Sequence, residues 1–86
     1  MIDDDTPILA ACENGNVTQV MYLVEHGANV NQNGKDSRSP LIVACTKGNE
    51  AMIDLLFEYG ANVNHSDRYH NTPLIAACRQ GNITIV

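Results

Sequence analysis

The fold is decided by the stretch Thr72-Pro73-Leu74-Ile75-Ala76-Ala77-Cys78, because the chain contains two earlier versions of it. These are Thr6-Pro7-Ile8-Leu9-Ala10-Ala11-Cys12 and Ser39-Pro40-Leu41-Ile42-Val43-Ala44-Cys45, each 33 residues before the next. A fixed period of about 20–50 residues is typical of stacked supersecondary units, none of which can bury its apolar face alone. The repeat therefore predicts a stack of units that acts through an extended surface and is not built around a pocket.

Each unit carries the signals of two short helices followed by a loop. In the middle unit, Ser39 is a good helix N-cap, and Pro40 suits the first helical position because a missing N–H costs nothing there. Gly48 ends this helix after about two turns. Asn49 can then cap a second helix, which ends at Gly60. The other units have the same signals at equivalent positions, so we expect the same pair of helices in each.

The segments between the helix pairs have no helical period. Residues 28–38 and 65–71 are rich in turn formers, which predicts extended loops or β-turn fingers. The predicted units are residues 6–38, 39–71 and 72–86. Together they form one domain over residues 1–86, and the third unit stops about midway along its second helix. We interpret the chain as a fragment of a longer repeat protein.

The order Thr-Pro-Leu, Ala-Ala, Gly, Leu-Leu and Gly-Ala-Asn-Val-Asn, at a 33-residue period, resembles the ankyrin repeat over nearly all of residues 6–86. The resemblance implies an all-α ankyrin-repeat solenoid of stacked helix-turn-helix units with β-turn or hairpin fingers. It also implies a protein–protein interaction module in which the fingers and the first helices form a concave face.

Two departures from the family pattern carry structural expectations. Ankyrin repeats usually have His directly after Thr-Pro-Leu, whereas this chain has Leu9, Ile42 and Ile75. We expect burial of these side chains to replace the contact of the histidine. The glycine usual two residues before the Thr is Ser37 in one finger and His70 in the other, which leaves the turn geometry of the fingers open.

Length, charge and hydropathy limit the number of domains and the kinds of partner that we expect. A chain of 86 residues allows one domain, which buries about 60–65% of its unfolded surface. The sequence contains no apolar run of roughly 18 residues and no basic and apolar leader, so we expect no membrane partner and a cytoplasmic or nuclear protein with reduced thiols. The net charge of −5 argues against nucleic acid as the main partner.

The cysteines and histidines favour packing over chemistry. Cys12, Cys45 and Cys78 share one phase of the repeat. Stacked helices lie about 10 Å apart, whereas a disulfide needs Cα atoms within about 7 Å, so we expect small buried side chains and no bridge. No Cys-x-x-Cys pair, phosphate-binding loop or zinc-protease motif is present, and the three histidines lie at helix ends or in fingers. We therefore expect a non-enzyme without a metal or cofactor.

The predicted partner-binding face combines the finger tips with the exposed side of the first helices. Carried over position by position from the family, it contains Lys35, Asp36, Arg38, Thr46, Lys47, Tyr59, Arg68, Tyr69, Asn71, Arg79 and Gln80. The first repeat adds Glu13 and Asn14. All five basic residues of the chain lie in this set, whereas the second helices carry Glu25, Glu50, Asp54 and Glu58.

This sorting of charge predicts an acidic or phosphorylated protein segment as the partner. Tyr69 is the expected anchor, because Tyr and Arg are enriched at the energetic centres of interfaces. The alternative interpretation is an ordinary solvated charged surface. A rival function is structural, with self-association through an apolar patch that the incomplete third unit leaves on the second.

Asn31 and Asn64 occupy the loop position that asparaginyl hydroxylases modify in some members of the family. Each follows a Val and has a Leu eight residues upstream, but the usual acidic residue two positions before is Asn29 or Asn62. The alternative role of both side chains is to form hydrogen bonds with the backbone of the turn.

Overall fold

The computed structural model describes residues 7–79. Its elements are the helices α1 (Pro7–Asn14), α2 (Val17–Glu25), α3 (Pro40–Lys47), α4 (Glu50–Glu58) and α5 (Pro73–Arg79), with a 3₁₀ turn at Lys35–Ser37. No β-strand occurs in this range, which confirms the all-α prediction. None of these helices is long and apolar enough to cross a membrane. The predicted Thr6 cap and the second helix of the third unit lie outside the described residues.

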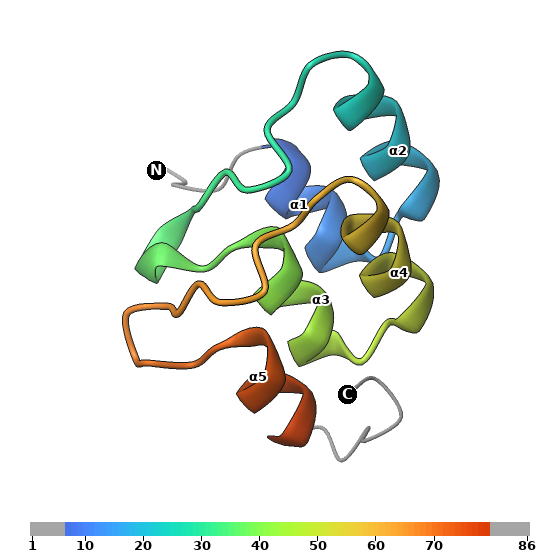
Figure 1. Cartoon of the computed structure of the whole chain (residues 1–86). Helices are drawn as coiled ribbons and strands as arrows, with labels where there is room; N and C mark the ends of the chain where they lie inside the picture. The colour runs from blue at the N-terminus through green and yellow to red at the C-terminus, as the bar shows by residue number, and fades with distance from the viewer. Residues whose placement is uncertain (1–6, 80–86) are drawn as a thin grey trace.

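The helices form two rows, as the helix-turn-helix units predict. The first helices of the three units, α1, α3 and α5, lie in one row, with α3 packed between the other two (Figure 1). The second row is α2 and α4, which contact each other and the first helices of their own units. The first finger (residues 28–38) and the second finger (residues 61–71) extend on the side away from α2 and α4 (Figure 1). The fingers and the first helices therefore share one face of the stack.

The caps form where the sequence predicts them. Ser39 Oγ accepts a hydrogen bond from the backbone N–H of Ile42 at 3.2 Å, and Asn49 Oδ1 accepts one from Met52 at 3.1 Å. The same bond recurs at Asn16 and Thr72. Gly48 ends α3 in the left-handed conformation, with φ of 69°. Local hydrogen bonds thus set the limits of helices that are too short to be stable alone.

The core is centred on α3, whose residues 40–45 are all buried. Leu9 and Ile42 are buried, which confirms the expectation for the position after the Thr-Pro-Leu pattern. The expectation is wrong for Ile75, which is exposed. The preceding residue differs in the same way, since Leu74 is 51% exposed and its equivalent Leu41 is 1% exposed. The reason is that α3 has a helix on both sides, whereas within residues 7–79 α5 packs mainly on α3.

Both fingers have a left-handed residue where the family usually places a glycine, although neither has that glycine. The first finger has a second left-handed residue, Asp36, which has no counterpart at the equivalent Tyr69. Ser37 and His70 both adopt the left-handed conformation, with φ of 60° and 68°. Such a conformation costs a residue with a Cβ about 1–2 kcal/mol. The open question about turn geometry is thus answered: each finger keeps the left-handed turn and carries its strain.

Hydrogen bonds join the fingers to each other. His65 in the second finger lies with its Nε2 2.7 Å from the carbonyl oxygen of Ser37 in the first finger. The backbone N–H of Arg68 donates to the carbonyl of Asp36 at 2.7 Å. The spacing of the fingers is therefore fixed by direct bonds as well as by the helices beneath them.

Candidate partner-binding surface

A groove of about 370 Å³ opens between the two fingers and the row of first helices. Its lining residues are Asp36, Arg38, Thr46, Asp67, Tyr69, Asn71, Ala76 and Arg79. Asp67 and Ala76 are absent from the predicted set, and the other lining residues belong to it. The structure thus brings residues from both fingers, α3 and α5 into one site.

Asp67 organises the wall of the groove. Its Oδ1 accepts hydrogen bonds from the backbone N–H groups of Tyr69 at 2.8 Å and Asn71 at 2.9 Å. Its Oδ2 accepts a third from Asn71 Nδ2 at 3.2 Å. An Asp that begins a turn and caps the backbone two residues later is a common turn signal, so the sequence contained the clue to this role. Asp67 therefore holds Tyr69 and Asn71 in their positions on the groove.

The Asp67 carboxylate is ionised at neutral pH. Burial by itself would raise its pKa, but the hydrogen bonds from Asn71 and Tyr69 and the nearby charge of Arg38 outweigh burial and lower the pKa below its usual value. Asp67 is 8% exposed, so its charge acts inside the protein wall. The groove consequently has buried negative charge beneath an exposed rim that contains arginine.

Most of the basic side chains predicted for this face already have acidic neighbours. Glu13 of α1 lies 3.4 Å from Arg38 Nη1 and 3.3 Å from Lys47 Nζ. Arg68 Nη1 lies 3.4 Å from Asp36 Oδ1. Ion pairs whose side chains are partly exposed in this way contribute about 0–1 kcal/mol, so they remain exchangeable. The face is positive, but less so than a count of its basic residues indicates.

The remaining predicted residues lie in different places. Arg79 lines the groove, and Lys35 is exposed in the 3₁₀ turn of the first finger. Neither forms an ion pair with another residue of the described range, 7–79. Asn14 is exposed at the end of α1, and Gln80 lies outside the described residues. Arg79 is therefore the cation of the groove that the described part of the chain leaves without an acidic neighbour.

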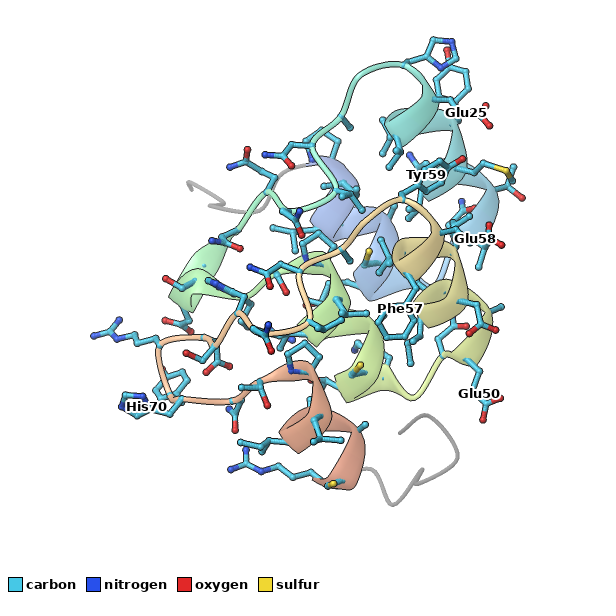
Figure 2. All side chains as sticks on the ribbon, in the orientation of Figure 1. Glu25, Glu50, Phe57, Glu58, Tyr59 and His70 are labelled. Atoms are coloured by element: carbon cyan, nitrogen blue, oxygen red, sulfur yellow. The ribbon has the colours of Figure 1, made fainter. Side chains whose placement is uncertain are left out.

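Tyr59 lies apart from the groove. It follows α4 and its hydroxyl donates a hydrogen bond to Glu25 Oε2 at 3.3 Å. Figure 2 shows Tyr59, Glu25 and Glu58 on the side of α2 and α4, and His70 at the opposite side on the second finger. Burial and the Glu25 carboxylate raise the pKa of the Tyr59 hydroxyl above its usual value. Tyr59 thus belongs to the acidic side of the molecule.

The two asparagines predicted as modification sites differ in their bonding. The Asn31 side chain accepts a hydrogen bond from the Asn62 backbone N–H at 2.7 Å and donates to the Gly60 carbonyl at 3.4 Å. Asn31 thus forms side chain-to-backbone hydrogen bonds, but they run to the next unit and not to its own turn. Asn64 is exposed, and its side chain forms no hydrogen bond within residues 7–79.

The buried thiols of Cys12 and Cys45 have little nucleophilic character. Cys12 and Cys45 are buried free thiols, as predicted, and burial raises their pKa to about 12 and about 11. A raised pKa keeps a thiol protonated and unreactive.

Cys78 is exposed, so the expectation of burial is wrong there, because α5 is covered less than α3. Among residues 7–79 no group of three or more His, Cys, Asp and Glu residues is arranged to hold a metal ion.

Comparison with known proteins agrees with this architecture. A family model described as ankyrin repeats (3 copies) matches residues 2–67 and, in a second match, residues 35–86. No curated protein matches the chain. The two matches overlap and together span all the helix pairs and both fingers described above. The chain therefore belongs to the ankyrin-repeat family.

Proposed function

We propose that this chain is a non-catalytic module that binds an acidic segment of a partner protein in the groove between the fingers and the first helices. Ankyrin repeats are in general protein–protein interaction modules. The observation that carries the specific proposal is the groove itself, whose exposed polar groups include the Arg79 guanidinium and the Tyr69 hydroxyl. Neither side chain forms a hydrogen bond within residues 7–79, and both can donate to a carboxylate.

The distribution of charge supports an acidic partner. The basic residues lie on the fingers, α3 and α5, whereas α2 and α4 carry acidic residues and no Lys or Arg. An acidic segment is thus attracted to one face and repelled by the other, which selects its orientation during the encounter. We also propose a cytoplasmic or nuclear location, where buried free thiols such as Cys12 and Cys45 remain reduced.

The rigidity of the face supports binding without a large ordering cost. The fingers are joined by the bond between His65 and Ser37 and by that between Arg68 and Asp36. Asp67 fixes the backbone that carries Tyr69. A partner therefore meets side chains that are already in place, and little conformational entropy opposes docking.

The experiment is a titration of the protein with a peptide of alternating glycine and glutamate, followed by NMR. We expect shifts at Tyr69, Asn71 and Arg79. The double substitution Arg38→Glu and Arg68→Glu should weaken binding, mainly by slowing association and reducing its salt sensitivity. The control is Ala51→Glu, which adds negative charge to exposed α4 and should change affinity little. Unchanged affinity of the double variant at low salt would refute the acidic character of the partner.

A second function, self-association, is favoured by one specific observation. Leu74 and Ile75 of α5 are exposed, whereas the equivalent Leu41 and Ile42 are buried against neighbouring helices. We propose as the alternative that a second copy covers this end of the stack. Light scattering at two protein concentrations checks it, with Leu74→Glu expected to abolish any concentration-dependent increase in mass. A constant monomer mass would exclude the alternative.

We further propose that, of the two candidate asparagines, Asn64 is the substrate for hydroxylation. Its side chain is free of hydrogen bonds within residues 7–79, whereas a hydroxylase must first break two bonds to reach the Asn31 side chain. Mass spectrometry of protein from hydroxylase-competent cells should show modification of the peptide that contains Asn64 only. Unmodified peptides would end this proposal.

A further inference from the structure

Glu13 occupies a position that an acidic partner would be expected to take. Its Oε2 lies 3.4 Å from Arg38 Nη1, and its Oε1 lies 3.3 Å from Lys47 Nζ. The three residues come from α1, the end of the first finger and the last turn of α3. One carboxylate thus spans two cations, with a separate oxygen facing each, and Arg38 also lines the groove.

We propose that Arg38 and Lys47 form a subsite for a carboxylate of the partner segment, and that Glu13 fills this subsite in the free protein. The inference rests on the proposed function, since it names the side-chain chemistry that the partner presents at one end of the groove. Binding then exchanges one carboxylate for another, and Glu13 moves into solvent.

The geometry favours exchange because Glu13 is a poor fit to the two cations. Its contacts of 3.4 and 3.3 Å exceed the roughly 2.7–2.9 Å of good charge-assisted hydrogen bonds. The side chains of Glu13, Arg38 and Lys47 are 33%, 32% and 47% exposed. Ion pairs this accessible to water contribute little to stability. A partner carboxylate that is free to approach along the groove can form shorter bonds with both cations.

Electrostatics also explain why the subsite takes an anion once Glu13 leaves. The charge of Arg38 also helps to lower the pKa of Asp67, so Lys47 is the cation of the subsite that depends more on Glu13. Lys47 has Glu13 as its only acidic neighbour within 4 Å among the described residues. Displacement of Glu13 without replacement would leave Lys47 unpaired, and an incoming carboxylate restores the pairing.

The test is the substitution Glu13→Gln, which keeps the shape of the side chain and removes its charge. The probe is a fluorescein-labelled peptide of alternating glycine and glutamate, titrated into the whole chain at about 0.15 M salt. We expect the Kd to fall by about three- to tenfold, because the peptide no longer competes with an internal carboxylate. The matched control is Glu58→Gln on α4, which makes the same change in net charge on the opposite side. Its Kd should stay within about twofold of the wild type, since charges beyond the Debye length are screened.

A double-variant cycle distinguishes local competition from a change in folding. In a chain that carries Arg38→Gln and Lys47→Gln, the further change Glu13→Gln should leave the Kd unchanged. If the wild-type chain binds the peptide at Tyr69 but Glu13→Gln binds no more tightly, this inference is overturned while the proposed function stands. If neither chain binds the peptide, both are overturned.

Discussion

The two fingers are closed by the same backbone hydrogen bond but are held by different side chains. In both, a backbone hydrogen bond of 2.9 Å closes the turn, from Gly34 to Arg38 in the first finger and from Asp67 to Asn71 in the second. The second finger adds the three hydrogen bonds to the Asp67 carboxylate. The first finger has Gly34 at that position and therefore lacks such a carboxylate. The shape of a finger thus depends on the backbone and its neighbours, and Asp67 determines how firmly the shape is held.

The two fingers also contribute different residues to the groove. The first finger contributes Asp36 and Arg38 to the groove, and Asp36 adopts a left-handed conformation, with φ of 61°. The second finger contributes Tyr69, whose backbone is fixed by Asp67. The groove therefore has one wall whose backbone is bonded to a buried carboxylate and one wall without such a carboxylate.

The largest effect is expected from Asp67→Ala. This change leaves the backbone N–H groups of Tyr69 and Asn71 without their acceptor, and we expect a loss of about 2–3 kcal/mol in the free energy of unfolding. Urea denaturation checks it. Asp54→Ala on the exposed face of α4 is the control and should change stability by less than about 0.5 kcal/mol. Equal effects of the two substitutions would show that the carboxylate does not stabilise the second finger.

The pH dependence of stability should follow the same carboxylate. The pKa of Asp67 is lower in the folded chain than its ordinary value of about 3.9, so the unfolded chain binds more protons between the two values. The Asp67 carboxylate therefore contributes fully to the free energy of unfolding above about pH 5. This contribution is lost as the pH falls through the pKa that Asp67 has in the folded chain. The stability difference between the wild type and Asp67→Asn should be constant from about pH 5 to 7 and should shrink at lower pH. A difference that grows on acidification would contradict the lowered pKa.

Relief of the left-handed strain should have a moderate effect that is similar in both fingers. We expect Ser37→Gly and His70→Gly each to raise the free energy of unfolding by about 0.5–1 kcal/mol, because the steric cost disappears while the unfolded chain gains some entropy. Thermal unfolding measures the change. The control is Ser66→Gly. Ser66 does not have a positive φ, so this substitution should lower the free energy of unfolding. Loss of stability at residues 37 and 70 would mean that their side chains compensate for the strain.

The smallest effect is expected from Gly34→Asp, which gives the first finger the carboxylate that it lacks. Gly34 has φ of −114°, so a side chain is compatible with the sign of its backbone angle. We expect a gain of about 0.5 kcal/mol from new hydrogen bonds to the backbone of the turn. Hydrogen exchange should show slower exchange of the amide of Asp36, the equivalent of Tyr69. Faster exchange would indicate that the first finger cannot adopt the bonding of the second.

Local signals made the helices predictable, and contacts between distant residues limited the prediction of the surface. The caps at Ser39 and Asn49 follow from residue types and a spacing of three residues. The exposure of Ile75 and Cys78 depends instead on what packs against α5, which a repeat pattern does not specify. Tyr59 was grouped with the groove by its place in the repeat, whereas its hydroxyl bonds to Glu25 across 34 positions of the chain.

The charge of the surface was also only partly predictable from the sequence, because it depends on contacts between distant residues. Sequence places Arg38, Lys47 and Arg68 on one face, but it does not show that Glu13 and Asp36 lie beside them. The role of Asp67 was within reach of sequence reasoning, because Asp at the start of a turn is a familiar backbone cap. The distances of these pairs depend on side-chain conformations, which the repeat period does not determine.

The bonds that join the fingers have a consequence for variation between repeats. The His65 ring bonds to a carbonyl of the first finger, Arg68 bonds there through its own backbone, and Asn31 bonds to the backbone of the second finger. In each case at least one side of the bond is a main-chain atom, which every amino acid supplies. Only the Arg68 bond has main-chain atoms on both sides, whereas the other two need the side chains of His65 and Asn31. Positions 36 and 68 can therefore be diversified while their bond survives, so this part of the recognition surface is free to change faster than the two side chains that join the units.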